Sequence, residues 1–69
     1  METLQAIREA QLSARQDQTA YTLFVEGGAP KRKPVANLSH AAMGIDFSLS
    51  SEQALIGFVF PSGRFEGRY

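Results

Sequence analysis

The spacing of apolar residues near the N-terminus predicts a helix over residues 3–16. Strong helix formers fill this interval, and the chain has no glycine or proline before Gly27. Thr3 stands where an N-cap residue is expected. Positions separated by three or four residues form a thin stripe of mainly apolar side chains: Leu4, Ile7, Ala10, Gln11 and Ala14. We expect this face to lie on the protein's own sheet, with a helix–helix contact as the alternative.

Strands are predicted over residues 19–26 and 45–50. The first is rich in β-branched and aromatic residues and stops at Gly27. The second shows the clearest alternation in the chain, in which Ile45, Phe47 and Leu49 are separated by polar residues. Such a period of two indicates a strand with one face toward the core and one toward water.

The C-terminal part of the chain predicts a hairpin. Residues 54–60 are apolar and favour a central strand, although Ser50 and Gln53 match a capping box and leave a helix as the alternative. Pro61 and Gly63 suit a three-residue hairpin loop. Residues 64–69 then alternate again and form a last strand at the edge of the sheet.

Two glycines, two prolines and three consecutive cations occur in residues 27–34 and predict an exposed basic loop. Residues 35–43 favour a short helix opened by Pro34 and ended by Gly44, with an extended segment as the alternative. The chain as a whole is therefore predicted to be a single α+β domain over residues 1–69. Its N-terminal helix packs on an antiparallel sheet of three to four strands.

The small size and the absence of cysteine restrict how this domain is stabilised. A 69-residue chain has a marginal core, and without cysteine it has neither disulfides nor thiolate metal ligands. His40 is the only histidine and cannot hold a structural zinc by itself. We therefore expect no metal and no cofactor, and we expect self-association as a homodimer. The sequence contains no nucleophile, phosphate-loop or dinucleotide motif, so it does not predict an enzyme.

Charge and hydropathy place the chain among cytoplasmic proteins that do not enter membranes. Seven basic and seven acidic side chains cancel, which disfavours nucleic acid and anionic membrane surfaces as main partners. No apolar stretch is long enough for a membrane span, and the N-terminus has no signal-peptide pattern. Met1 suggests that the 69 residues are a whole gene product.

Aromatic residues are numerous for a sheet that one short helix must cover. Some are therefore expected to be exposed on the second face or at the edge, with Phe24 beside Phe58 or Phe60. Exposed aromatic residues with arginine nearby are typical of protein interfaces. The predicted partner-binding residues are Phe58, Phe60, Arg64, Phe65, Arg68 and Tyr69, with Lys31, Arg32 and Lys33 as an electrostatic rim.

This profile of a very small, neutral, cysteine-free and aromatic-rich domain resembles the accessory proteins of phages and other mobile elements. The resemblance implies a module that binds a larger protein and inhibits or modulates it. Two alternatives use the same residues. A nucleic-acid-binding regulator would use Lys31, Arg32 and Lys33, with the hairpin arginines beside them. A structural assembly subunit would use the C-terminal edge strand.

Overall fold

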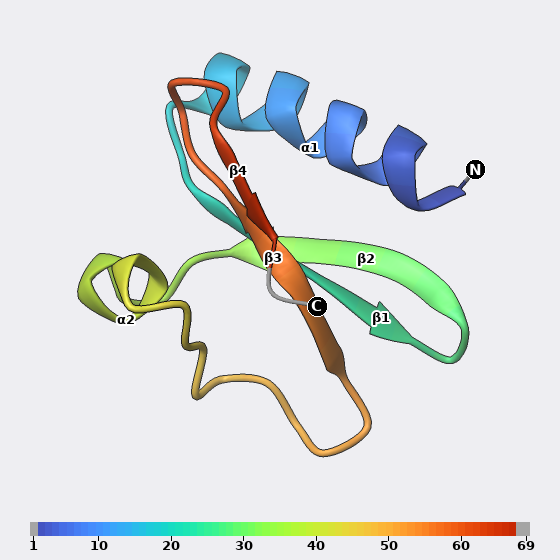
Figure 1. Cartoon of the computed structure of the whole chain (residues 1–69). Coiled ribbons are helices and arrows are strands. Elements are labelled where there is room, and N and C mark those ends of the chain that lie inside the picture. The colour runs from blue at the N-terminus through green and yellow to red at the C-terminus, as the bar shows by residue number, and fades with distance from the viewer. Residues whose placement is uncertain (1, 68–69) are drawn as a thin grey trace.

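The computed structural model describes residues 2–67 and consists of one long helix, one short helix and four strands (Figure 1). The elements in chain order are α1 (Glu2–Asp17), β1 (Tyr21–Glu26), β2 (Ala29–Pro34), α2 (Leu38–Ala42), β3 (Ala54–Val59) and β4 (Phe65–Gly67). The strands form one sheet in the order β2-β1-β3-β4, and all neighbouring pairs are antiparallel. The α+β class, with the N-terminal helix packed on a four-stranded sheet, is confirmed.

Residues 27–34 are not the exposed loop that the sequence predicted. Only Gly27 and Gly28 form the turn, with φ of 62° and 79°, and the chain returns at once as β2. A two-residue hairpin turn of this type requires positive φ at both positions, which glycine adopts without strain. The prolines and cations that indicated a loop are tolerated because β2 is an edge strand, paired with β1 alone.

Helix α1 covers one face of the sheet and forms the main core with it (Figure 1). This core consists of Ala10, Ala14, Leu23, Ile56 and Val59. The two alanines allow the helix to approach the sheet closely, whereas Leu4, predicted on the same stripe, is half-exposed. The helix ends at Gln18, whose φ of 52° lets the Thr19 amide donate to the Ala14 carbonyl over 3.1 Å. That bond satisfies a helix-end carbonyl as in a Schellman motif.

Residues 35–53 cover the opposite face of the sheet. The short helix predicted in residues 35–43 is confirmed as α2, but Asn37 caps it instead of Pro34. The Asn37 side chain accepts hydrogen bonds from the Ser39 and His40 amides. Gly44, with φ of 78°, ends the helix as predicted. This layer buries Thr22, Phe24 and Phe58, which lie on the face of the sheet away from α1.

The strand predicted over residues 45–50 is absent, and the segment makes turns instead. Asp46 explains the difference. Its side chain accepts hydrogen bonds from the Thr22 hydroxyl at 2.7 Å and from the Ser48 amide at 2.8 Å. The bond to Ser48 turns the chain locally and competes with strand formation, as aspartate side chains often do. Residues 45–50 therefore form a loop that Asp46 attaches to the sheet, despite their alternating sequence.

Strands β3 and β4 form the predicted C-terminal hairpin. The predicted strand over 54–60 is confirmed as β3, and Pro61, Ser62 and Gly63 form the three-residue loop. The Gly63 amide donates to the Phe60 carbonyl, and the Phe60 amide donates to the Arg64 carbonyl. Strand β4 occupies Phe65–Gly67, and the rest of the predicted 64–69 strand, Arg68 and Tyr69, lies outside the described residues.

Candidate interaction surfaces

The structure separates the six predicted partner-binding residues. Phe58 is only 1% exposed and belongs to the second-face core, so its side chain is unavailable to a partner. Phe60 and Phe65 are half-buried, and Arg64 is exposed and forms an ion pair with Glu66 at 2.5 Å. Arg68 and Tyr69 lie outside the described residues. The expectation that aromatic residues remain uncovered on the second face was wrong for Phe24 and Phe58, because residues 35–53 cover them.

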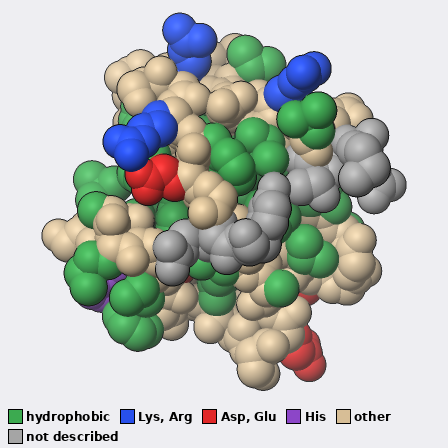
Figure 2. Space-filling view, viewed as in Figure 1, with side chains coloured by type: hydrophobic (Ala, Val, Ile, Leu, Met, Phe, Trp, Pro, Cys, Tyr) green, Lys and Arg blue, Asp and Glu red, His purple; other side chains and the backbone are tan. Residues whose placement is uncertain are grey.

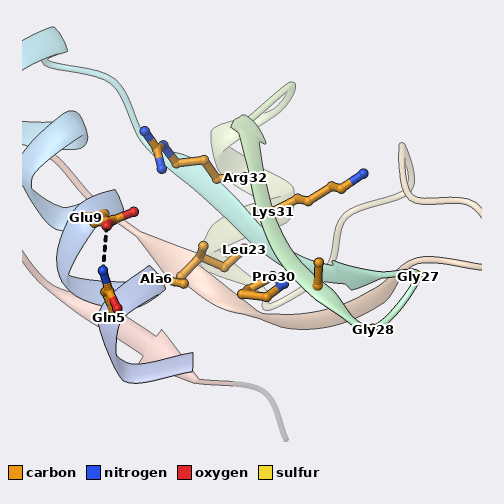
Figure 3. A pocket seen from close by; sticks show the side chains of 10 residues that line it. Gln5, Ala6, Glu9, Leu23, Gly27, Gly28, Pro30, Lys31 and Arg32 are labelled. Carbon is orange, nitrogen blue, oxygen red and sulfur yellow. Dashed lines mark hydrogen bonds between the residues drawn. The ribbon is translucent and has the colours of Figure 1, made fainter. Parts of the chain in front are cut away.

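The three consecutive cations do not form one basic patch. Successive residues of a strand point to opposite faces, and Figure 3 shows Lys31 and Arg32 extending to opposite sides of β2. Lys31 pairs with Glu26 at 3.4 Å. Lys33 donates to the Ser48 carbonyl at 3.1 Å, and its ammonium lies 5.5 Å from the Phe24 ring centre. A rim formed by all three is therefore not supported.

Arg32 lies on the α1 side of the sheet, with its guanidinium 6.0 Å from the Tyr21 ring centre. The Tyr21 hydroxyl donates to the Asp17 carboxylate over 2.7 Å. This hydrogen bond is the largest of the effects that raise the pKa of Tyr21. Arg32 also lines a hollow of about 360 Å³ between the first half of α1 and the β1–β2 hairpin, together with Glu9 and Lys31 (Figure 3). The opposite charges in this hollow favour no single class of ligand.

An exposed ridge on α1 combines basic and apolar side chains. It consists of Leu4, Arg8, Leu12 and Arg15, which are separated by three or four residues and so share one side of the helix. Leu12 is 61% exposed and Leu4 is 51% exposed, although both are large apolar residues. Within the described residues, neither Arg8 nor Arg15 forms an ion pair. We call this set the α1 ridge.

The β3–β4 loop extends the α1 ridge. The Gln11 side chain donates to the Gly63 carbonyl over 2.8 Å and fixes the loop against the helix. A hollow of about 490 Å³ lies between them and is lined by Arg8, Leu12, Arg15, Gln11, Ser62 and Gly63. A second hollow on the other side of the loop is lined by Phe60 and Arg64, among others. In Figure 2 the basic side chains of the visible face lie along its upper part, over α1 and this loop.

A second exposed apolar group lies at the corner formed by α2. Leu38, Met43 and Phe47 are each more than half exposed, and the Phe47 ring packs edge-on against His40 with 5.0 Å between ring centres. Figure 2 shows hydrophobic side chains around the histidine at the lower left, where α2 lies in Figure 1. This contact assigns His40 a packing role beside Phe47.

The acidic side chains and His40 form no cluster of three that could hold a metal ion, within residues 2–67. Over the same range, neither helix has the length and apolar character that crossing a bilayer would require. No family model matches the chain, and neither a curated protein nor a solved structure matches it. The fold and surface chemistry of this chain are therefore the basis for a functional proposal.

Sequence reasoning missed the α1 ridge, although a signal for it was present. Leu12 does not share the spacing of the buried stripe, and a leucine off that stripe must lie toward solvent. The prediction concentrated on the aromatic residues of the C-terminus. In the structure, Phe58 is buried and Phe65 packs against the core, so neither is freely available to a partner.

Proposed function

We propose that this chain is a non-catalytic module that binds a larger protein and inhibits or modulates it, in the manner of phage accessory proteins. The α1 ridge and the adjoining β3–β4 loop form the partner-binding surface. The observation that carries the proposal is Leu12, a large apolar side chain exposed between Arg8 and Arg15. Arginine and exposed apolar side chains together are enriched in protein interfaces, where a few such residues supply most of the binding energy.

The chemistry of this surface defines the partner. The guanidinium groups of Arg8 and Arg15, which form no ion pair with the residues that the structure describes, attract carboxylates, and Leu12 between them offers an apolar contact. We therefore propose a partner surface on which acidic side chains surround an apolar one. Arg64 and Phe60 were predicted from the sequence as partner-binding residues. They lie on the far side of the β3–β4 loop and extend the proposed surface. Phe65 is half-buried against the core on the α1 side of the sheet, and Phe58 is removed from the site by its burial.

The nucleic-acid alternative is weakened by the positions of the cations on β2. Lys31 and Lys33 are engaged with Glu26 and Ser48, and Arg32 faces the other side of the sheet. The arginines of the α1 ridge could contact phosphates, but an exposed leucine between them favours a protein surface. Nucleic acid binding is therefore an outcome that the experiment must distinguish.

The test begins with tagged protein in bacterial lysate, with and without nuclease treatment, and a captured protein is then purified for titration calorimetry. We expect Leu12→Ser to weaken its binding about thirtyfold, which corresponds to the loss of one interface hot spot of about 2 kcal/mol. We expect Arg8→Glu with Arg15→Glu to abolish binding. The matched control for each single arginine change is Arg32→Glu, which makes the same charge change away from the ridge and should leave the affinity unchanged.

Two results would contradict the proposal. One is a captured protein whose affinity is the same for the wild type and for the Leu12→Ser variant. The other is nucleic acid as the only copurifying species, with an affinity that falls steeply with salt and depends on Arg8 and Arg15.

A further inference from the structure

The two edges of the sheet differ in what they offer to another strand. The Val35 amide donates to the carbonyl of Ala20, next to β1, over 2.9 Å. Alternate residues of β2, counted back from Pro34, therefore direct their backbone groups outward. The outward positions are Pro30, Arg32 and Pro34. Because proline has no N–H group, only Arg32 presents a donor on this edge. The β2 edge is therefore blocked against strand addition.

The β4 edge carries no such block. The Phe60 amide donates to the Arg64 carbonyl, and Glu66 lies opposite Phe58, so Arg64 and Glu66 direct their backbone groups toward β3. The N–H and C=O groups of Phe65 and Gly67 consequently point away from the sheet. Among residues 2–67, no hydrogen bond to these outward groups is present. Strand β4 thus offers unpaired backbone groups to a partner strand.

We infer that the β4 strands of two copies of this chain pair with each other, antiparallel and centred on Phe65, to form a symmetric dimer. The inference specifies an interface for the homodimer that the sequence analysis expected, and it does not depend on the proposed partner-binding surface. In this arrangement the Phe65 N–H of each copy donates to the Phe65 carbonyl of the other. Arg64 of one copy then lies opposite Glu66 of the other, and the same pair occurs twice because of the symmetry.

Charge excludes one of the registers that the backbone allows. Only outward-pointing residues can pair with one another, so the twofold axis passes through residue 65, 66 or 67. The axis at residue 66 places Glu66 opposite its own copy, and like charges directly opposite each other destabilise a strand pair. The axis at Phe65 places Arg64 opposite Glu66 and so matches opposite charges. The axis at residue 67 would instead bring residue 68 opposite Glu66, and the Arg68→Glu variant below distinguishes the two.

The blocked β2 edge explains why the assembly closes at two copies. After β4 has paired, each copy presents only its β2 edge, where Pro30 and Pro34 prevent further addition. A continuous eight-stranded sheet results from two four-stranded sheets. Pairing through one edge also adds buried surface to a chain whose own core is small.

The test is analytical ultracentrifugation of the full chain over a range of concentrations. The wild type should be a dimer. Arg64→Glu and Glu66→Arg each create two like-charge pairs and should each raise the dimer dissociation constant by about tenfold or more. The double variant Arg64→Glu with Glu66→Arg restores opposite charges and should return the constant close to that of the wild type.

The matched control is Lys31→Glu, which disrupts a comparable surface ion pair with Glu26 near the other edge. It should leave dimerisation unchanged, and circular dichroism should show that all variants fold. A monomeric wild type would overturn the inference, and so would a double variant that dissociates like the single ones. Dissociation caused by Arg68→Glu but not by Arg64→Glu would overturn the Phe65-centred register. Loss of dimerisation with unchanged partner affinity would leave the proposed function intact.

Discussion

Gly57 is the strand glycine at which an added side chain would have the least space. A Cβ atom there would collide with the carbonyl oxygen of Glu66 and lie 2.8 Å from Cε1 of Phe65. The Phe65 ring therefore rests against the backbone of β3, a position open only because residue 57 has no side chain. This contact also holds Phe65 half-buried next to the proposed dimer edge.

We predict that Gly57→Ala lowers the free energy of unfolding by about 1–3 kcal/mol, because either the ring or strand β4 must move. Urea denaturation followed by circular dichroism measures the loss. Gly67→Ala is the matched comparison, since its Cβ would lie 3.3 Å from the same ring and should cost less. Equal stabilities for Gly57→Ala and the wild type would show that the close contact is absent in solution.

Asp46 is the polar residue that attaches residues 45–50 to the sheet. Its partial burial alone would raise its pKa, but the hydrogen bonds from Ser48 and Thr22 and the charge of Lys33 outweigh burial and lower the pKa below its ordinary value. A carboxylate with a lowered pKa in the folded state stabilises the fold above its unfolded pKa of about 3.9. This contribution is lost as the pH falls through the folded-state pKa.

Asp46→Asn should therefore destabilise the protein by about 1–2 kcal/mol at pH 7, because charged hydrogen bonds are replaced by weaker neutral ones. The difference from the wild type should shrink as the pH falls below about 4, because the carboxyl is protonated first in the unfolded chain and at still lower pH in the folded protein. Urea denaturation at pH 7 and pH 3 measures both values, with Glu52→Gln as the control for an exposed carboxylate on the same segment. A difference that does not change with pH would refute the role assigned to the charge.

At the scale of elements, β2 shows how one strand can have the composition of a loop. Its pairing with β1 requires only alternate amides, and the prolines occupy the outward positions where no amide is needed. Pro30 and Pro34 thus leave the β1–β2 ladder intact while they close the edge. Their placement is a property of the strand as a unit, since either proline shifted by one residue would remove a hydrogen bond to β1.

Replacement of both prolines, Pro30→Thr with Pro34→Thr, restores two outward N–H groups and opens the second edge. We expect assemblies larger than a dimer that grow with concentration, because each copy then has two edges available. Size-exclusion chromatography with light scattering measures their mass. The same exchange at Pro61, in the β3–β4 loop, is the control and should leave the mass unchanged. A double variant that remains the size of the wild type would contradict the edge-blocking role of the prolines.

At the scale of the whole molecule, different structural elements cover the two faces of a small sheet. Helix α1 covers one face through alanines, and residues 35–53 cover the other through α2 and the Asp46 attachment. Of the residues assigned to the two proposed contacts, Arg64 alone borders both. The α1 ridge presents arginine and leucine to a partner protein, whereas β4 presents backbone groups to a second copy. Changes in Arg8 and Arg15 should therefore leave dimerisation unaffected.

Much of the fold could be predicted because its signals are local. The helix formers of residues 3–16, the Pro61–Gly63 loop and the apolar run of 54–60 each specify their own structure through spacing and backbone preference. Residues 27–34 and 45–50 were predicted wrongly, since tertiary contacts determine both. An edge position tolerates the prolines of β2, and the Thr22 hydroxyl holds Asp46 at the sheet, 24 residues away in the chain.

The sequence alone thus determined the α+β class, α1, the hairpin turn at Pro61–Gly63 and the absence of thiolate ligands for a metal site. Only the tertiary structure decided which aromatic residues are buried, because burial depends on what covers the second face. It also decided that the three cations of β2 divide between two faces and that Leu12 stands exposed between arginines. These properties arise from packing between distant segments, which the local pattern of residues does not specify.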